Sequence, residues 1–316
     1  MTTSRKAQPL VVGIGEVLWD LLPSGPQLGG APANFAFHAH SLGAKAVVIS
    51  RVGADRLGQE ILSRFQAIGL TTEAIQTDPE APTGTVEVTL NGAGVPLFVI
   101  RENVAWDHLA VEQTALATVR QADAICFGTL AQRSPTARKS IQRLIAAASP
   151  DSLRVLDVNL RQQFYSREVL ESSLRLANVL KLNDLELPLL AEMFNLGNSG
   201  PDAIEQLTRA FDLRVVALTR GDRGSLLFRQ GQWSEQQPKQ ITVADTVGAG
   251  DAFSAALVTG LLAEMDLDEV HDFASEVARF VCSQPGAMPV LPAEFRKRSV
   301  CSPKEVHDYP HSGVFE

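Results

Sequence analysis

The sharpest chemical signal in this chain is D-T-V-G-A-G-D at residues 245–251, which runs into a long apolar stretch. Residues 252–262 are apolar nearly all round, so we expect a buried helix that begins at the small-residue turn 248–250. Free backbone N–H groups and the helix dipole make such a terminus an anion site. Asp251 would lie in the first turn, beside the anion, and we expect the dipole to keep it ionised at pH 7. This arrangement suits phosphoryl transfer, although a tight turn followed by an acid remains the structural alternative.

A second group, G-G-A-P-A-N at residues 29–34, opens another expected helix, because proline is favoured in a first helical turn. The two glycines permit close approach of a ligand to the backbone. Asn34 is both donor and acceptor and could bind a sugar hydroxyl. Glu16 and Asp20 follow the first expected strand, where ligands gather in open α/β sheets, and Asp20 could accept hydrogen bonds from two hydroxyls of a polyol. Taken singly, Asn34 and Asp20 could also be an ordinary helix residue and an ordinary turn acid.

Three further polar groups follow apolar runs that we expect to be strands. They are D-V-N-L-R at 157–161, K-L-N-D-L-E at 181–186 and T-R-G-D-R-G at 219–224. Asn183 and Glu186, three residues apart, could share one helical face near a hydrated Mg²⁺. The glycines of the third group would let the backbone approach a nucleotide. Any one group could be a capping or turn motif, but together they place polar side chains at the ends of successive strands.

Several common site motifs are missing from the sequence. There is no G-x-x-x-x-G-K-[ST], which argues against a P-loop enzyme. Gly13 and Gly15 match the first two glycines of a dinucleotide fingerprint, but Leu18 stands at the third place and no helix follows, which argues against an NAD site. The six histidines are scattered and form no Cys/His cluster, so a transition-metal site is not expected.

These polar groups are spaced along an alternation of short apolar runs and helical patterns. We expect strands at 9–14, 47–50, 124–127, 154–158 and 215–218, and helices at 32–42, 57–68, 135–147, 167–177 and 201–211. Strands that alternate with helices predict a three-layer α/β/α fold, with a mostly parallel sheet covered on both faces.

Two segments break this alternation. Residues 83–89 and 97–101 alternate in strand fashion around Asn91-Gly92, which predicts a hairpin. Residues 17–28 carry a turn and show no helical period. We expect the segments at about 17–28 and 83–103 to form one small β-layer beside the main sheet of a single domain. A lid and a plain edge hairpin both fit the pattern.

Composition narrows the class of protein. The chain has 316 residues, 45% apolar and 20% charged, with 28 Lys+Arg against 36 Asp+Glu and a net charge of −8. This is globular composition, and the acidic balance argues against nucleic acid as a partner. No apolar run is long enough to cross a bilayer. Three widely spaced cysteines, two of them in apolar contexts, indicate a reducing compartment, so we expect a cytoplasmic protein.

Together, G-G-A-P-A-N and D-T-V-G-A-G-D, more than 200 residues apart, resemble the two signatures of the ribokinase-like sugar kinases, the phosphofructokinase-B family. The resemblance extends over roughly residues 10–292 and includes the three strand-end groups in the family's order. The G-G-A-P-A-N form and the opening G-E-V-L-W-D look most like fructokinases. Departures are Val247, where relatives often have Thr, and the segment beyond Pro292, which carries no motif of the family.

The resemblance implies a role for each matching position. Asp251 would be the catalytic base that deprotonates the sugar hydroxyl attacking the γ-phosphate of ATP. The implied anion hole is formed by Gly248, Ala249 and Gly250. The implied sugar-binding residues are Asp20, Gly30, Asn34 and Arg161, with Phe98 and Arg101 in the lid, and the implied nucleotide-binding residues are Asn183, Thr219, Gly221 and Gly224. Asn183 and Glu186 would organise Mg²⁺ through water, and Asp245 would lie at a monovalent-cation site for K⁺. In many relatives the lid also forms a homodimer contact.

The resemblance thus implies an ATP-dependent kinase that phosphorylates a sugar hydroxymethyl group, with fructose converted to fructose 6-phosphate as the first expectation. A kinase for 2-keto-3-deoxygluconate or ribose is the close alternative, and a nucleoside or vitamin kinase is a more distant one. From other classes, a non-catalytic sugar or nucleotide sensor and an oxidoreductase remain to be tested. The intact Asp251 turn argues against the sensor, and the missing third glycine argues against the oxidoreductase.

Overall fold

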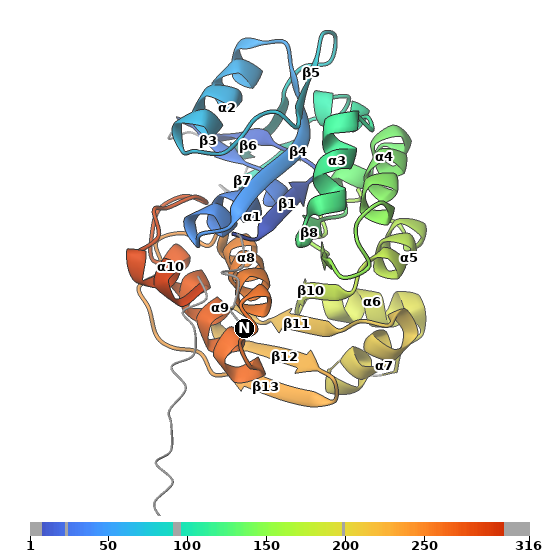
Figure 1. Ribbon diagram of the computed structural model, residues 1–316, viewed down its shortest axis with the longest axis vertical. Coiled ribbons are helices and arrows are strands. Elements are labelled where there is room, and N and C mark those ends of the chain that lie inside the picture. Colours follow the sequence, from blue (N-terminus) through green and yellow to red (C-terminus); the bar gives the residue numbers. More distant parts are fainter. Residues whose placement is uncertain (1–7, 23–24, 91–95, 198–199, 300–316) are drawn as a thin grey trace, which may run out of the picture.

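The computed structural model describes residues 8–22, 25–90, 96–197 and 200–299, without the side chains of residues 88–98. A nine-stranded sheet runs through the molecule, and helices cover both of its faces (Figure 1). Its strands in spatial order are β13 (Gln232–Gln236), β12 (Ser225–Arg229), β11 (Val215–Thr219), β10 (Val179–Asn183), β9 (Leu153–Asp157), β8 (Ala124–Phe127), β1 (Leu10–Ile14), β4 (Lys45–Gly53) and β5 (Ile75–Asp78).

This sheet is parallel from β5 to β11 and antiparallel only at one edge. There β12 and β13 pair antiparallel with β11 and with each other. The expected three-layer α/β/α fold is therefore confirmed. Strands β1, β8, β9, β10 and β11 are neighbours in this sheet and run in one direction, so their carboxyl ends meet at one edge. The polar groups noted in the sequence follow these strands at that edge.

Strand residues alternate between two hydrophobic clusters, one on each face of the sheet. In β1, for example, Val11 and Val12 are both fully buried but belong to opposite clusters. One face is covered by α3 (Gln113–Gln121), α4 (Pro135–Ala146), α5 (Arg167–Leu176), α6 (Glu186–Phe194) and α7 (Pro201–Phe211). The other face is covered by α1 (Ala31–Ser41), α2 (Arg56–Ala67), α8 (Ala249–Leu262), α9 (Leu267–Cys282) and α10 (Ala293–Ser299).

The element bounds agree with the expected ones to within two residues at most ends, and α7 agrees at both. Helix α8 is buried around nearly its whole circumference, as its composition predicted, because it lies between α1 and α9 (Figure 1). No expectation was made for β5, α3, β12, β13, α9 or α10. Helix α9 begins at a capping box, in which Asp266 accepts a hydrogen bond from the backbone of Glu269 at 2.8 Å.

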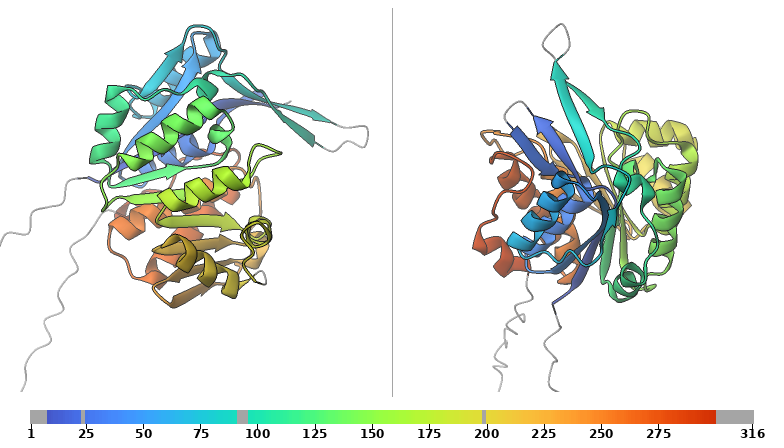
Figure 2. Two further views of the ribbon diagram at one scale, coloured as in Figure 1. Left: turned by 90° about the vertical axis from the view of Figure 1, so that its right-hand side faces the viewer. Right: turned by 90° about the horizontal axis from the view of Figure 1, so that it is seen from above.

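A second, four-stranded sheet contains both segments that broke the alternation. Its order is β3 (Gly25–Gly29), β2 (Leu18–Leu22), β6 (Gly84–Leu90) and β7 (Pro96–Ile100). The predicted hairpin is thus paired with β2 and is not an edge of the main sheet. Its two strands extend as a ribbon away from the body of the molecule (Figure 2), and Val99 on this ribbon is about half exposed.

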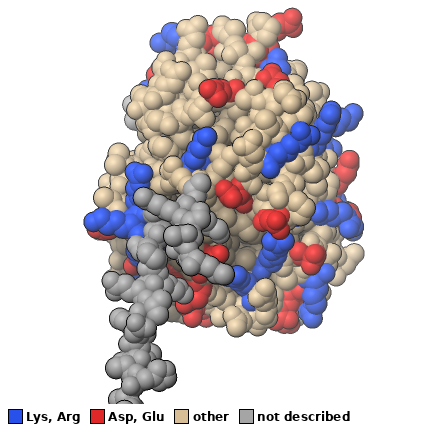
Figure 3. Space-filling model, viewed as in Figure 1, with Lys and Arg blue, Asp and Glu red and all other residues tan. Residues whose placement is uncertain are grey.

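Charges of both signs are interspersed on the face of the molecule seen in Figure 3. That face therefore presents no large field of one sign. Within the described residues, no helix combines the length and the apolar character that crossing a membrane requires.

Candidate active site

The two signature segments meet at the N-termini of α1 and α8. Asn34, in the first turn of α1, donates a hydrogen bond from Nδ2 to Oδ2 of Asp251, in the first turn of α8, at 2.7 Å. The two residues are 217 positions apart in the chain. Tertiary packing therefore joins an amide that can bind a hydroxyl and a carboxylate that can accept its proton.

The proton affinity of Asp251 differs from the expectation. Burial, together with the nearby Asp157 carboxylate, raises its pKa from 3.8 to about 7, although Asn34 and Lys181 act to lower it. The expectation that the helix dipole keeps Asp251 fully ionised at pH 7 is therefore wrong. The reason is that removal of a carboxylate from water outweighs the favourable dipole. A carboxyl with this pKa is better suited to act as a general base near neutral pH than an ordinary aspartate.

The turn before Asp251 has the geometry of an anion site. Gly248 precedes α8 with φ +78°, and a Cβ there would lie 2.5 Å from the carbonyl oxygen of Ala287. Ala249 and Gly250 are the first two helical residues; the Ala249 N–H donates to the Thr246 carbonyl at 3.4 Å, and the Gly250 N–H has no partner within the helix. Gly248 is therefore required by both backbone conformation and space, and the turn presents backbone donors next to Asp251.

Three carboxyl groups near the start of α1 and α8 are influenced by the charge of one guanidinium, that of the exposed Arg161. The charge of Arg161 acts to lower the pKa values of Glu16, Asp20 and Asp251, while its Nη1 donates a hydrogen bond to the Leu160 carbonyl at 3.2 Å. Burial nevertheless raises the pKa of Glu16 to about 7 and that of Asp20 to about 6. Of the sugar-binding residues that the resemblance implied, Asn34 is bonded directly to Asp251, and the charge of Arg161 acts on both Asp20 and Asp251.

Two buried acceptor atoms of this cleft have no hydrogen-bond partner among the described residues. They are Oε2 of Glu16 and Oδ1 of Asn34, and both residues are more than nine-tenths buried. Gly30, which precedes α1 with φ +106°, has no room for a Cβ because the Glu16 carbonyl oxygen would lie 2.5 Å away. Buried acceptors need donors, and the hydroxyl groups of a polyol would supply them.

Asn183 and Glu186 do not share a helical face, because Asn183 ends β10 and α6 begins only at Glu186. They instead bond to each other's backbone. Oδ1 of Asn183 accepts from the Glu186 N–H at 2.9 Å, and the Glu186 carboxylate accepts from the N–H groups of Asn183 and Leu160, each at 2.8 Å. With these oxygens already engaged, the pair fits a hydrated cation held through water better than direct ligation. No group of three or more His, Cys, Asp or Glu that could ligate a metal directly occurs within the described residues.

The third strand-end group lies beside this pair. Thr219, the last residue of β11, is in register with Asn183 of β10. Gly221 and Gly224 have φ of +58° and +81°, which favour glycine, and Gly224 also passes close to the backbone of Gln236. The residues that the resemblance assigns to nucleotide and Mg²⁺ therefore form one continuous rim along β10 and β11.

Asp245 lies just before the anion turn. Its Oδ1 accepts from the Val247 N–H at 3.0 Å and its Oδ2 from the Gly286 N–H at 3.1 Å. It therefore ties the turn to the segment that also carries Ala287, the residue packed against Gly248.

Of the two lid residues implied by the resemblance, Arg101 has a described side chain. The side chain of Phe98 lies outside the described residues. Arg101 follows β7 and is exposed, and its backbone oxygen accepts a hydrogen bond from Arg133 at 2.6 Å. No hydrogen bond or ion pair joins the Arg101 side chain to Asp20, Asn34 or Asp251 within the part of the chain that the structure describes.

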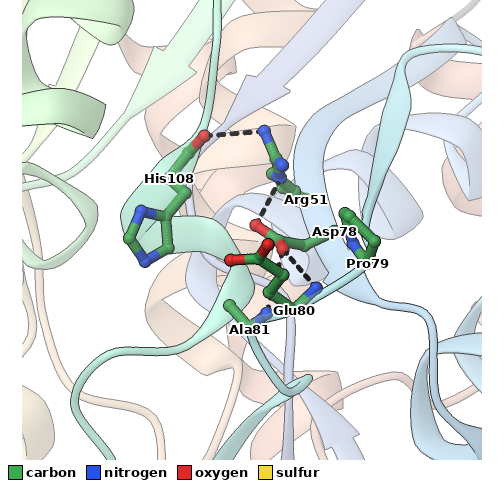
Figure 4. Close-up of a pocket in the computed structure, with 6 residues that line it drawn as sticks. All are labelled: Arg51, Asp78, Pro79, Glu80, Ala81 and His108. Atoms are coloured by element: carbon green, nitrogen blue, oxygen red, sulfur yellow. Dashed lines mark hydrogen bonds and ion pairs between the residues drawn. The ribbon is translucent and has the colours of Figure 1, made fainter.

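Two cavities lie at different places in the fold. A small one, enclosed between the start of α1, β8 and α8, is lined by Asp157 and Asp251. A larger one lies at the ends of β4 and β5 (Figure 4). There Arg51 is paired with Asp78 at 2.9 Å and donates to the His108 backbone at 3.0 Å. It contains none of the residues that the sequence analysis selected, and its Arg51 and Asp78 are paired with each other.

The roles of Asp157 and Lys181 were not identified from the sequence, although both lie in motifs noted there. Lys181 interrupts an apolar strand, V-L-K-L-N, and its side chain is only 8% exposed. A lysine inside a buried strand must have a partner of opposite charge, so the sequence V-L-K-L-N could have indicated a buried ion pair. The partner is Asp157 on the neighbouring strand, at 3.0 Å.

Comparison with known proteins agrees with this geometry. The sequence profile of the pfkB family of carbohydrate kinases matches residues 26–294. A sugar kinase of Pyrococcus horikoshii is 29% identical over 297 residues, covering 88% of this chain and 91% of its own. The fructokinase of Escherichia coli is 28% identical over 297 residues, covering 88% of this chain and 95% of its own.

Solved structures show the same fold. The Pyrococcus horikoshii sugar kinase in complex with ATP superimposes with a TM-score of 0.77 at 28% identity, over 92% of this chain and 99% of its own. A 2-dehydro-3-deoxygluconokinase of Thermotoga maritima superimposes with a TM-score of 0.78 at 18% identity, over 94% of this chain and 99% of its own. The paired signatures, the ribokinase-like architecture and the matched profile lead to one conclusion: this chain belongs to the pfkB family of carbohydrate kinases, enzymes that transfer a phosphoryl group to an alcohol of a sugar.

Proposed function

We propose that this enzyme transfers the γ-phosphoryl group of ATP to a hydroxymethyl group of a sugar, and that D-fructose is the sugar. The observation that carries the proposal is the 2.7 Å hydrogen bond between Asn34 and Asp251. A sugar hydroxyl bound by Asn34 would lie next to the carboxylate that removes its proton and next to the turn that receives the phosphoryl group.

In this proposal Asp251 acts as general base, with a pKa of about 7 that leaves much of it ionised at neutral pH. The N–H groups of the turn formed by Gly248, Ala249 and Gly250 stabilise the charge on the phosphoryl oxygens as it is transferred. As the hydroxyl proton passes to Asp251, the sugar oxygen forms a bond to the γ-phosphorus, and the bond from phosphorus to the leaving ADP oxygen breaks.

Sugar recognition would rest on the carboxyl groups and the guanidinium in the cleft. Asp20 and the unpaired acceptors of Glu16 and Asn34 would accept hydrogen bonds from ring hydroxyls. Gly30, which has no side chain, would let the sugar ring approach the backbone. The positive charge of Arg161 would offset the negative charge of the carboxylates. Phe98 and Arg101 would complete the site from the lid. Lid closure would exclude water, which otherwise competes with the sugar as acceptor.

The nucleotide would lie on the rim of Thr219, Gly221 and Gly224. Asn183 and Glu186 would hold Mg²⁺ through its water shell, and the ion would supply charge neutralisation for the phosphate groups. Asp245, which ties the anion turn to Gly286, would lie at a monovalent-cation site for K⁺. The proposal includes a homodimer formed through the β6–β7 ribbon, which sedimentation would detect.

The test is ADP release from MgATP with fructose, ribose, glucose, mannose, 2-keto-3-deoxygluconate and adenosine. The Asp251→Asn variant runs beside the wild type, and Asp202→Asn is the matched control because Asp202 is an exposed acid in the first turn of another helix, α7. We expect fructose-dependent turnover that falls by about 10²–10⁴-fold in Asp251→Asn and is unchanged in Asp202→Asn. Sugar binding, measured by calorimetry, should persist in Asp251→Asn.

Each other outcome revises a different part of the proposal. Turnover with 2-keto-3-deoxygluconate or ribose alone would keep the mechanism and replace the sugar. Full activity of Asp251→Asn would overturn the base assignment. Binding of sugar or ATP without turnover of any acceptor would favour a sensor.

A further inference from the structure

A buried ion pair lies directly beneath the N-terminus of α8. Asp157 ends β9 and Lys181 is its register partner on β10, with Nζ 3.0 Å from Oδ1 of the carboxylate. Both side chains are more than nine-tenths buried. Burial of two charges has a large desolvation cost, and such a pair can often be replaced by apolar residues without loss of stability. Its presence here therefore calls for a role other than stability.

Lys181 touches the turn that precedes the base. A Cβ on Gly250 would lie 2.9 Å from Nζ of Lys181, so the absence of a side chain at Gly250 is what admits the ammonium. A positive charge thus lies against the backbone of the turn. It adds to the positive end of the helix dipole at the same place.

Asp157 is bonded to the same helix. Its second oxygen, Oδ2, accepts a hydrogen bond from Oγ of Ser254 at 3.0 Å, and Ser254 lies one turn after Gly250 on α8. Asp157 and Asp251 also line the same small cavity. The pair is therefore held at fixed distances from the base by Ser254 on one side and by Gly250 on the other.

We propose that Asp157 and Lys181 are positioning residues for the reaction, whose opposed charges act from below on the Asp251 carboxyl and on the phosphoryl-binding turn. This inference rests on the proposed function, in which Asp251 is the base. Neither residue contacts the sugar in this account. Both act through α8, by setting how readily Asp251 takes up a proton.

The direction of each effect follows from the sign of each charge. The negative charge of Asp157 raises the pKa of Asp251, and the positive charge of Lys181 lowers it. The other groups that act on this carboxyl come from α1 and from the segments after β1 and β9. They are Asn34, Glu16 and Arg161; the Cys126 thiol of β8 is also near, but burial raises its pKa and keeps it uncharged where Asp251 titrates. Because those groups are unchanged by substitutions in the pair, loss of one partner or the other must shift the titration of Asp251 in opposite directions.

The test is a carboxyl ¹³C NMR titration of the full-length protein labelled at aspartate Cγ, with the Asp251 signal assigned by its loss in Asp251→Asn. We expect the midpoint to rise by about one pH unit in Lys181→Met and to fall by about one unit in Asp157→Asn. Arg51→Met is the matched control, because it breaks the remote pair with Asp78 seen in Figure 4 and should leave the Asp251 midpoint unchanged.

A buried carboxylate without its partner could prevent Lys181→Met from folding, which thermal unfolding would reveal. In that case the double variant Asp157→Asn/Lys181→Met is compared with Asp157→Asn, because neither protein contains the unpaired Asp157 carboxylate. Addition of Lys181→Met to Asp157→Asn must raise the midpoint above that of Asp157→Asn alone. A purely structural pair would give shifts of the same sign in both single variants, or shifts no larger than those of Arg51→Met, and either result overturns the inference.

The titration needs no turnover, so it separates this inference from the proposed function. If no sugar is phosphorylated but the opposed shifts appear, the proposed function fails and the charge pair stands. If turnover is found, the acid limb of the kcat profile should move in the same direction as the NMR midpoint in each active variant.

Discussion

At the scale of single residues, the ionisation of Asp251 is a balance between burial and one hydrogen bond. Burial raises its pKa to about 7, and the Asn34 amide acts against this because a donated hydrogen bond stabilises the carboxylate. A general base must be ionised, so we predict that kcat/KM falls as the pH drops below about 7. Asn34→Ala removes the stabilising hydrogen bond, which raises the pKa further and moves this acid limb to higher pH.

The measurement is kcat/KM for sugar between pH 5.5 and 9 at saturating MgATP. Asn195→Ala, at the exposed end of α6, serves as the control for loss of an amide and should keep the wild-type profile. An acid limb that Asn34→Ala leaves in place, or moves to lower pH, would show that the hydrogen bond does not control the base.

At the scale of elements, the start of α8 depends on a glycine that no other residue can replace. Gly248 has φ +78°, and the carbonyl oxygen of Ala287 occupies the space of a Cβ. Gly231, in the turn between β12 and β13, has a nearly identical φ of +80° but open space around it. We predict that Gly231→Ala costs about 1 kcal/mol from backbone strain alone, whereas Gly248→Ala costs more and also displaces the turn.

Urea unfolding and kcat measured on both variants check this prediction. Gly231→Ala should keep wild-type kcat, and Gly248→Ala should lose at least about tenfold because the N–H donors move away from the phosphoryl oxygens. Equal stability losses in the two variants would mean that the contact with Ala287 is unimportant.

At the scale of the whole molecule, the buried carboxyls of the cleft link stability to pH. Burial raises the pKa of Glu16 from 4.5 to about 7, so the folded protein retains a proton that the unfolded chain loses. The contribution of Glu16 to the free energy of unfolding is fully present below about pH 4.5 and is lost as the pH rises through 7. His38 and His271 act in the opposite sense, because burial lowers their pKa values to about 4 and an unfolded histidine binds the proton up to about pH 6.5.

A comparison of Glu16→Gln with the wild type cancels the histidine effects, which both proteins share. We predict that Glu16→Gln gains stability relative to the wild type as the pH rises from 5 to 7.5. The gain is at most roughly 3 kcal/mol, since one pKa unit corresponds to about 1.4 kcal/mol. Urea unfolding at the two pH values measures it, and a difference that does not change with pH would show that Glu16 titrates normally.

Much of the architecture was predictable because it depends on local patterns. Apolar runs and helical periodicity placed most strands and helices, including α7 and β8 at both ends. Strands β12 and β13 were not predicted. The edge strand β13, Q-W-S-E-Q, is mostly polar, and β12, S-L-L-F-R, has an apolar run of only three residues. Asn183 was assigned to a helix because spacing alone does not show that the chain is still extended at that residue.

The sequence by itself determined which residue types follow each strand and the family to which the chain belongs, because both are properties of short segments and their order. Only the tertiary structure decided that Asn34 bonds to Asp251, that Asp157 and Lys181 lie beneath the same turn, and that burial raises the pKa of Asp251. Distances between segments 217 residues apart, and the exclusion of water around a carboxyl, come from packing of the whole chain and are not encoded in any one segment.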